Sequence, residues 1–472
     1  MSSQIEILES GVMDWRQTLR ESLRGGTASL TEGPLGRAIV ILAVPMVLEM
    51  VLESVFAVVD IFFVSRLGAP AMAAVGITES LLALIYTIAG GLSIGVTAVV
   101  ARRMGERDPD GAAVAAVQAA ALGVLASAII GIAAGIHAPA LLRLMGAGPE
   151  VVRAGAGYAT IMLGGNAAIM LLFLFNAAFR GAGDATVAMR VLWLANGINL
   201  VLDPCLIFGL GPFPELGVAG AAVATTIGRG AAVLAQVVTA VRWSGRLRIR
   251  KRHLRISARV MAGVVRLSAA GTVQTFIATA SWIGLVRVLA GFGSAALAGY
   301  TIAIRLVIFA MLPAWGLANA AATMVGQNLG AGRPDRAERA VWIAGAMNLS
   351  LLGVIGSVFL LAAPQLVALF GVDPDTARHA IHGLRILGAG FVLYGLGLVL
   401  EQAFNGAGAA WTPTALNFVC FWLIEIPLAW LLAIRIGMGA DGVFTAIAVA
   451  FSVLTVISGV LFRRGRWKQA RV

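Results

Sequence analysis

The chain is short of charged residues, which make up 12% of its 472 positions. A soluble globular domain carries roughly 25% Asp, Glu, Lys and Arg. Half of that density cannot cover a water-facing surface on a chain of this length, and 59% of the residues are hydrophobic. The scarcity of charge therefore excludes an ordinary soluble protein and predicts that lipid surrounds much of the chain.

Groups that carry enzyme chemistry are scarce as well. The two cysteines, Cys205 and Cys420, lie inside apolar runs, where we interpret them as small buried hydrophobes and not as a disulfide framework. The four histidines show no metal-ligand spacing such as HExxH, and the Walker and dinucleotide phosphate motifs are absent. We therefore expect no enzyme, no catalytic residue, no cofactor beyond a coupling ion and no ATP-driven transport.

Acidic residues are fewer than basic ones, and the formal net charge is +12. Such an excess can indicate nucleic-acid binding, but Arg and Lys in short loops are also what the positive-inside rule produces. Basic residues gather in alternate connections between apolar runs, Arg180 and Arg190 among them, and in the C-terminal tail. We therefore expect no nucleic-acid partner and place both termini in the cytoplasm.

Twelve apolar runs are long enough to cross a bilayer, which takes about 20 mostly apolar residues. An even number of spans agrees with two termini on one side of the membrane. The segment before Gly36 has no apolar stretch of the signal-peptide kind, so we interpret it as a soluble lead-in. The approximate limits of the runs are 36–64, 71–100, 111–136, 150–179, 185–210, 217–242, 259–290, 296–327, 338–363, 375–404, 412–435 and 441–463.

The second half of the chain repeats the first. LGAPAMAAVG at 67–76 resembles FGSAALAGYT at 292–301, and FRGAGD at 179–184 resembles FNGAGA at 404–409, both with an offset of 225 residues. Each half holds six spans, so both halves cross the membrane in the same direction. Parallel six-helix repeats with a cleft between them are a transporter architecture.

The predicted organisation is an all-α integral membrane protein with two six-helix lobes. The parts are a cytoplasmic N-terminal segment (1–35), an N-terminal lobe (36–242), a basic connector (243–258), a C-terminal lobe (259–463) and a basic tail (464–472).

Acidic side chains inside the spans are the strongest functional signal, because each costs roughly 3 kcal/mol unless a cavity or partner compensates it. Glu49, Glu53 and Asp60 fall within about 40° on one face of the first span. Asn199 and Asp203, four residues apart, share a face of the fifth. We predict that Asp60, Asn199 and Asp203 form an ion-coupling site. The candidate substrate-cavity residues are Glu49, Glu53, Glu79, Asn176 and Gln274.

Two carboxylates close together in a poorly solvated site cannot both keep their charge without a compensating cation. Oxygen ligands suit a hard cation, so Asp60, Asn199 and Asp203 would bind Na⁺ if transport is sodium-coupled, and H⁺ stays equally open. Leu285 and Leu428 occupy the positions 225 residues further on, so we expect the ion site in the first lobe alone.

Pro45 lies one turn before Glu49 in the first span and removes a backbone hydrogen bond. It is either a tolerated membrane proline or a hinge, and we predict the hinge.

Several stretches resemble the multidrug and toxic compound extrusion (MATE) transporters. LAVPMVLEMVLESVFAVVDIFFVSRLG is similar to their first helix, NLVLDPCLIFG to their fifth, and ANAAATMVGQNLGAGRPDRAERA to the end of their eighth. RGAGD at 180–184 resembles their 4–5 loop. The likeness covers roughly residues 35–460, and the branch resembled is the prokaryotic DNA-damage-inducible-F-like one.

The resemblance implies a V-shaped pair of lobes that exports organic, often cationic, compounds in exchange for H⁺ or Na⁺. By position, Asp60, Asn199 and Asp203 match the N-lobe ion-coupling residues of the family, and either Thr225 or Thr226 matches a further polar member. The seventh span, SAAGTVQTFIATA, lacks the glutamate of the C-lobe cation site found in another branch. We expect a monomer in the bacterial inner membrane, with lipid around it.

Two other functions compete with drug export. A lipid-linked oligosaccharide or cell-wall-lipid flippase of the same superfamily resembles this architecture, but such flippases tend to have cationic cavities, and this first half is richer in membrane acids. An intramembrane aspartyl protease would explain GAGD at 181–184, but no Tyr-Asp pair supplies its second aspartate. The flippase therefore stays the alternative function.

Overall fold

The computed structural model describes residues 15–25, 29–242 and 245–470, and for residues 55–61 it describes the backbone without the side chains. All regular structure within these residues is helical. The first half contains α2 (Trp15–Arg24), α3 (Leu35–Ser65), α4 (Ala69–Gly105), α5 (Pro109–Ile136), α6 (Ala138–Leu144), α7 (Pro149–Gly164), α8 (Ala167–Ala182), α9 (Ala185–Phe208) and α10 (Val218–Arg242). The second half contains α11 (Ala258–Leu289), α12 (Ser294–Gly330), α13 (Pro334–Ala368), α14 (Pro374–Ala407), α15 (Trp411–Asn417), α16 (Ile426–Trp430) and α17 (Ala440–Arg463). Short 3₁₀ or π segments are η1 (Lys251–Leu254), η2 (Ala290–Phe292), η3 (Phe418–Glu425), η4 (Leu431–Arg435) and η5 (Arg466–Gln469).

The described residues contain 11 helices that are long and apolar enough to cross a membrane, or 12 if the bent pair of α7 and α8 is one span. This confirms the predicted set of apolar runs. The fourth run differs, because α7 and α8 meet at an angle of 41°. The Asn166 side chain at the bend donates a hydrogen bond to the Leu163 carbonyl (2.7 Å), which occupies an oxygen that a straight helix would leave to a backbone N–H.

The eleventh span is built from α15, η3, α16 and η4, which together run from Trp411 to Arg435. Pro427 lies within this span and has no N–H to donate to the preceding turn. The wider π-helical turns η3 and η4 flank it on both sides. The span therefore stays continuous in spite of the missing hydrogen bond.

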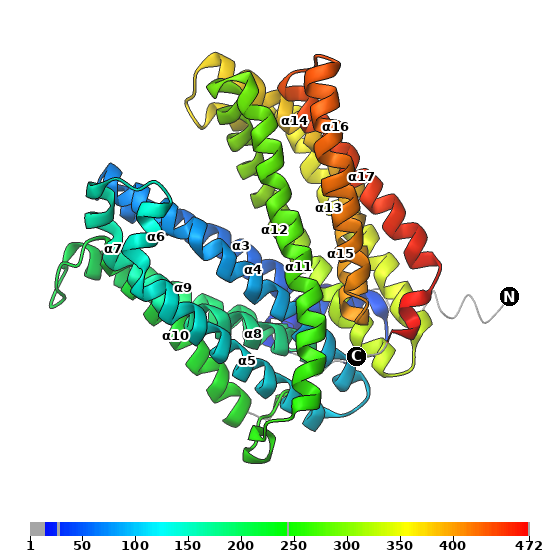
Figure 1. Ribbon diagram of the computed structural model, residues 1–472. Helices are drawn as coiled ribbons and strands as arrows, with labels where there is room; N and C mark the ends of the chain where they lie inside the picture. The colour runs from blue at the N-terminus through cyan, green and yellow to red at the C-terminus, as the bar shows by residue number, and fades with distance from the viewer. Residues whose placement is uncertain (1–14, 26–28, 243–244, 471–472) are drawn as a thin grey trace.

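The helices form a V, with α3 to α10 in one arm and α11 to α17 in the other (Figure 1). The arms separate at the end where α6 and α7 meet on one side and α14 begins on the other. They meet at the end that carries the C-terminus, which we call the closed end. The V-shaped, all-helical fold class predicted from the sequence is confirmed.

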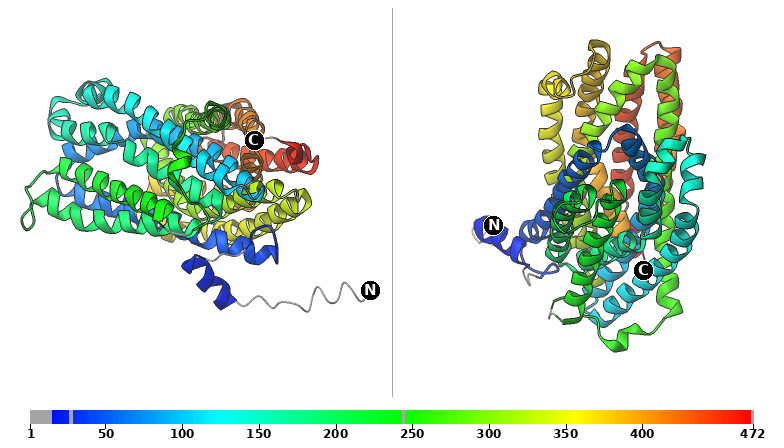
Figure 2. Two further views of the ribbon diagram at one scale, coloured as in Figure 1. Left: turned by 90° about the horizontal axis from the view of Figure 1, so that it is seen from below. Right: turned by 90° about the vertical axis from the view of Figure 1, so that its left-hand side faces the viewer.

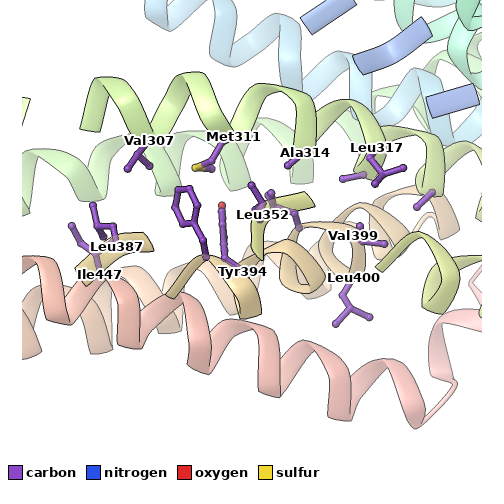
Figure 3. Close-up of a cluster of buried hydrophobic side chains, with 14 of the residues drawn as sticks. Val307, Met311, Ala314, Leu317, Leu352, Leu387, Tyr394, Val399, Leu400 and Ile447 are labelled. Atoms are coloured by element: carbon purple, nitrogen blue, oxygen red, sulfur yellow. The ribbon is translucent and has the colours of Figure 1, made fainter. Parts of the chain in front are cut away.

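Buried apolar side chains form two large clusters. One lies mainly in the first arm and also includes Val264 and Leu267 at the start of α11. The other lies mainly in the second arm, where side chains of α12, α13, α14 and α17 interlock (Figure 3). The start of α3, including Ile39 and Met46, also belongs to this second cluster. The first span therefore begins against the second arm and continues into the first, which ties the arms together at the closed end.

Glycines allow the arms to approach each other at the closed end. A Cβ atom at Gly105 of α4 would lie 2.0 Å from the Gln327 carbonyl oxygen of α12. At Gly330 of α12 it would lie 2.2 Å from the Arg102 carbonyl oxygen of α4. These two contacts are related by the same 225-residue offset that the sequence repeat shows. Equivalent residues of the two repeats therefore make equivalent contacts where the arms meet.

Both ends of the described chain cross from one arm to the other at the closed end. The carbonyls of Leu30 and Glu32 accept hydrogen bonds from Asn328 (3.3 Å) and Arg336 (3.0 Å) of the second arm. In the C-terminal tail, the Ala470 carbonyl accepts a hydrogen bond from the Arg102 side chain of α4 in the first arm. These contacts add to the glycine crossings in holding the arms together there.

We expect Gly330→Leu to force the closed end apart, because the added side chain has to displace the backbone of α4. Such overpacking typically costs about 1–3 kcal/mol. The reporter is a Gln327→Cys substitution, at a position that is 4% exposed in the parent protein. We expect this cysteine to react several-fold faster with a water-soluble thiol reagent when Gly330→Leu is present. Gly263→Leu in α11 is the matched control, since a Cβ there meets nothing within 4 Å. Equal labelling rates in both variants would contradict this account of the crossing.

Candidate functional site

A cavity of about 610 Å³ lies on the inner side of the first arm and reaches the second. We call it the N-lobe cavity. Three of its described lining residues carry carboxylates and two carry guanidinium groups. Its polar and aromatic lining includes Glu49 and Glu53 of α3, Glu79 and Tyr86 of α4, Asn176 and Arg180 of α8, Thr225 and Arg229 of α10, and Trp315, Asn319, Gln402 and Asn405 of the second arm.

Glu49 is the most deeply buried acid of this cavity, with 1% of its surface exposed. Its Oε1 accepts hydrogen bonds from Arg180 Nη1 (2.9 Å) and from Asn176 Nδ2 (3.1 Å). Gln236 Nε2 in turn donates to Asn176 Oδ1 (2.6 Å), which fixes the amide so that its nitrogen faces the carboxylate. A buried charge needs such a partner and further hydrogen bonds, and Glu49 has both.

Arg180 differs from its predicted place. We assigned it to the basic connection between the fourth and fifth spans, but it lies in the last turn of α8 with its side chain turned into the cavity. Its side chain is 12% exposed. It therefore compensates an acid inside the membrane instead of marking the cytoplasmic side.

A second group of polar side chains also lines the N-lobe cavity. Arg229 Nη2 donates to the Tyr86 hydroxyl (3.1 Å), and the Tyr158 hydroxyl donates to Glu79 Oε1 (3.4 Å). Arg229 lies within the apolar run at 217–242 and was not identified from the sequence. The argument that singled out the membrane acids applies to a membrane arginine as well and would have found it.

Three of the predicted ion-coupling residues come together between α9 and α10. Asn199 and Asp203 are 2% and 0% exposed. With the Asn199 nitrogen facing Asp203 Oδ2 (2.6 Å), its amide oxygen accepts from the Thr225 backbone N–H (3.1 Å) and hydroxyl (2.9 Å). This orientation satisfies both ends of the amide. Thr226 instead donates to the Ala222 carbonyl of its own helix (2.8 Å), so Thr225 makes the contact.

The side chain of Asp60 lies outside the described residues, so its distance to Asp203 is not part of the structure. The helices that carry the two aspartates, α3 and α9, pack against each other. Helix α3 is continuous through Pro45. The ion-coupling role of Asp60, Asn199 and Asp203, Na⁺ binding included, and the hinge role of Pro45 stay predictions.

The four candidate cavity residues of the first half all line the N-lobe cavity, whereas Gln274 lines an adjoining cavity of about 480 Å³ that lies mainly in the second arm. There Glu401 Oε1 accepts from Gln274 Nε2 (2.6 Å) and from Asn417 Nδ2 (2.8 Å). Gln274 and Glu401 are the counterparts of Glu49 and Asn176 at the 225-residue offset. The repeat thus keeps a carboxylate–amide pair in each arm but exchanges which helix carries the acid.

Comparison with known proteins agrees with this geometry. Residues 45–205 and 272–431 match the MatE family, once in each half of the repeat. The chain belongs to the MATE family. It is therefore a multi-pass membrane transporter and not an enzyme.

Individual MATE relatives cover nearly the whole chain. The protein named "Probable multidrug resistance protein YoeA" of Bacillus subtilis is 25% identical over 92% of this chain and 95% of its own length. The "FAD transporter" of Shewanella oneidensis is 27% identical over 91% of this chain and 94% of its own length. A solved structure described as the outward-facing conformation of a multidrug resistance MATE family transporter superposes with a TM-score of 0.86, at 27% identity over 93% of this chain and 98% of that one.

Proposed function

We propose that this MATE protein is a secondary active antiporter that exports organic, drug-like cations in exchange for H⁺ or Na⁺. The supporting observation is a cavity with three carboxylates and two guanidinium groups that lies between the arms of a V open at one end. Membrane acids in such a position are typical of substrate and ion pathways. The multidrug resistance name of the Bacillus subtilis relative favours the same substrate class.

The open end of the V faces the outside of the cell in this proposal. The basic residues gather at the closed end, with Arg102 and Arg103 in the last turn of α4, Arg107 after it, and Arg333 and Arg336 at the start of α13. By the positive-inside rule this end is cytoplasmic. The conformation is then outward-facing, and both termini lie in the cytoplasm beneath the bacterial inner membrane.

Coupling in this proposal uses the Asn199–Asp203–Thr225 network beside the N-lobe cavity. The network is separate from the Glu49–Arg180 pair, in which the acid is already compensated by a cation. Asp203 is buried and held by the amide of Asn199, so a proton or Na⁺ arriving there would change the charge of a poorly solvated site. Such a change of charge can shift the equilibrium between the conformation that is open at one end of the V and the conformation that is open at the other.

Reconstituted protein tests the proposal. We expect proteoliposomes to accumulate or release a fluorescent organic cation when a pH gradient is imposed, a Na⁺ gradient is imposed, or both, and not when neither is present. The gradient that drives movement identifies the coupling ion. Dye movement at the same rate with and without gradients would contradict secondary active transport.

An anionic cargo is the second candidate, as for a lipid-linked oligosaccharide flippase. Arg180 and Arg229 both reach the N-lobe cavity, and one relative is named for the transport of FAD, a dianionic dinucleotide. Transport of a fluorescent lipid-linked oligosaccharide or of FAD in the same proteoliposomes, in place of the cationic dye, would favour this candidate.

A further inference from the structure

Helix α2 lies outside the bundle of long helices, at the edge of the molecule (Figure 2). Its Thr18 and Ser22 side chains face the protein and are 2% and 0% exposed. The Ser22 carbonyl accepts a hydrogen bond from the Thr186 hydroxyl (2.9 Å), and the carbonyls of Leu23 and Arg24 accept from Arg190 (2.9 and 3.0 Å). These contacts hold α2 against the start of α9, at the closed end.

The apolar residues of α2 stay exposed beside its buried face, and at 100° per residue their row is centred about 80° around the helix from Thr18 and Ser22. Trp15, Leu19 and Leu23 follow one another at four-residue intervals and are 56%, 41% and 42% exposed. A helix on a water-soluble surface buries its apolar stripe and exposes its polar face. In α2 the small polar side chains are buried and the apolar stripe is exposed, so the stripe needs an apolar environment other than this arm.

A row of cations runs beside the stripe. Arg16, Arg20 and Arg24 have the same four-residue spacing, which at 100° per residue places their row about 100° around the helix from the centre of the stripe. The one acid of α2, Glu21, pairs with Arg37 of α3 (2.6 Å), and this guanidinium lowers the pKa of the Glu21 carboxyl. The three arginines therefore give the face of α2 a positive charge.

We propose that α2 lies in the membrane interface at the closed end of the transporter, with Trp15, Leu19 and Leu23 in the lipid and Arg16, Arg20 and Arg24 on anionic headgroups. Helices that lie in the interface combine a Trp- and Leu-bearing apolar face with cations along its border. Tryptophan favours the headgroup level, and anionic lipids attract such basic segments. The charge and the apolar stripe together fit an anionic lipid surface.

The placement of α2 supports lipid over a protein partner. Contacts with α9 and with Arg37 near the start of α3 keep it beside the ends of membrane spans. The apolar stripe is three residues long and one row wide, which suits shallow insertion between headgroups. This inference does not depend on the transported compound or the coupling ion.

Spin labels on the full-length protein in nanodiscs test the insertion. In a background with Cys205→Ala and Cys420→Ala, single variants Leu19→Cys and Gln17→Cys carry a nitroxide on the stripe and on the far side of α2. We expect the label at 19 to be accessible to oxygen dissolved in the lipid and at least about fivefold less accessible than the label at 17 to a water-soluble nickel complex.

Lipid composition tests the role of the arginines. Raising the phosphatidylglycerol content is expected to lower the nickel accessibility of the label at 19 further, and Arg16→Gln with Arg20→Gln is expected to remove this dependence. Equal nickel accessibility at positions 17 and 19 in every lipid would overturn the proposal. Protection of position 19 from both oxygen and nickel, together with spin–spin broadening between molecules, would also overturn the proposal. It would show that the stripe packs against a second copy of the chain and not against lipid.

Discussion

An Asp203→Asn variant is expected to insert and fold as the parent protein does, and to lose gradient-driven dye efflux. The carboxyl group is completely buried in the network with Asn199 and Thr225, where an amide of the same shape cannot take up or release a proton. A coupling free energy of about 1–3 kcal/mol corresponds to a loss of about 5-fold to 150-fold in the coupled rate. The measurement is dye movement in proteoliposomes under an imposed pH or Na⁺ gradient.

The fold is expected to tolerate this exchange because an asparagine oxygen can accept the hydrogen bond that Asn199 donates to Asp203 Oδ2. A matching elution profile in size-exclusion chromatography checks this point. Thr226→Val is the control, since Thr226 bonds to its own helix and should keep the parent rate. Wild-type coupled efflux by Asp203→Asn, or by Asp60→Asn, for which we expect the same loss, would show that the ion-coupling site lies elsewhere.

The spans and the repeat could be predicted because both follow from local patterns. An apolar run of about 20 residues has no stable place outside lipid or a core, and the 225-residue offset is visible in short glycine motifs. The bend between α7 and α8 could not be predicted in the same way. Gly164, Gly165 and Asn166 interrupt the run at 150–179 without ending it, and the Asn166 side chain that shapes the bend also bonds to the Ser127 carbonyl of α5.

The acids of the site could be predicted because each one is costly in a membrane. Their partners could not, since a partner depends on how helices rotate and how far they extend. Thr225 and Thr226 point about 100° apart on a helix, and only the packing of α10 against α9 decides between them. Arg180 was assigned to a loop because α8 continues further than the apolar run that predicts it.

The exchange of acid and amide between the arms adds a feature that neither half of the sequence reveals alone. Glu49 pairs with Asn176 in the first arm, and Glu401 pairs with Gln274 in the second. The first acid also binds Arg180, whereas the position equivalent to Arg180 in the second arm is Asn405. The acid of the first arm is therefore neutralised by a guanidinium group, and the acid of the second arm is bound by amides alone. Removing the partner of the acid should for this reason lower stability more in the first arm.

Arg180→Met is expected to destabilise the protein by about 3–5 kcal/mol, the usual cost of leaving one partner of a buried ion pair without the other. Methionine fills much of the same space, so lost packing contributes little. A second substitution, Glu49→Gln, removes the carboxylate that Arg180→Met leaves without a cation and keeps an oxygen to which Asn176 can donate. We expect the double variant to regain most of the lost stability. Thermal unfolding of the single variants and the double variant in detergent gives the coupling between the two residues. If the double variant is as unstable as Arg180→Met alone, the pair does not balance charge, and Arg180 would instead stabilise α8 by its packing.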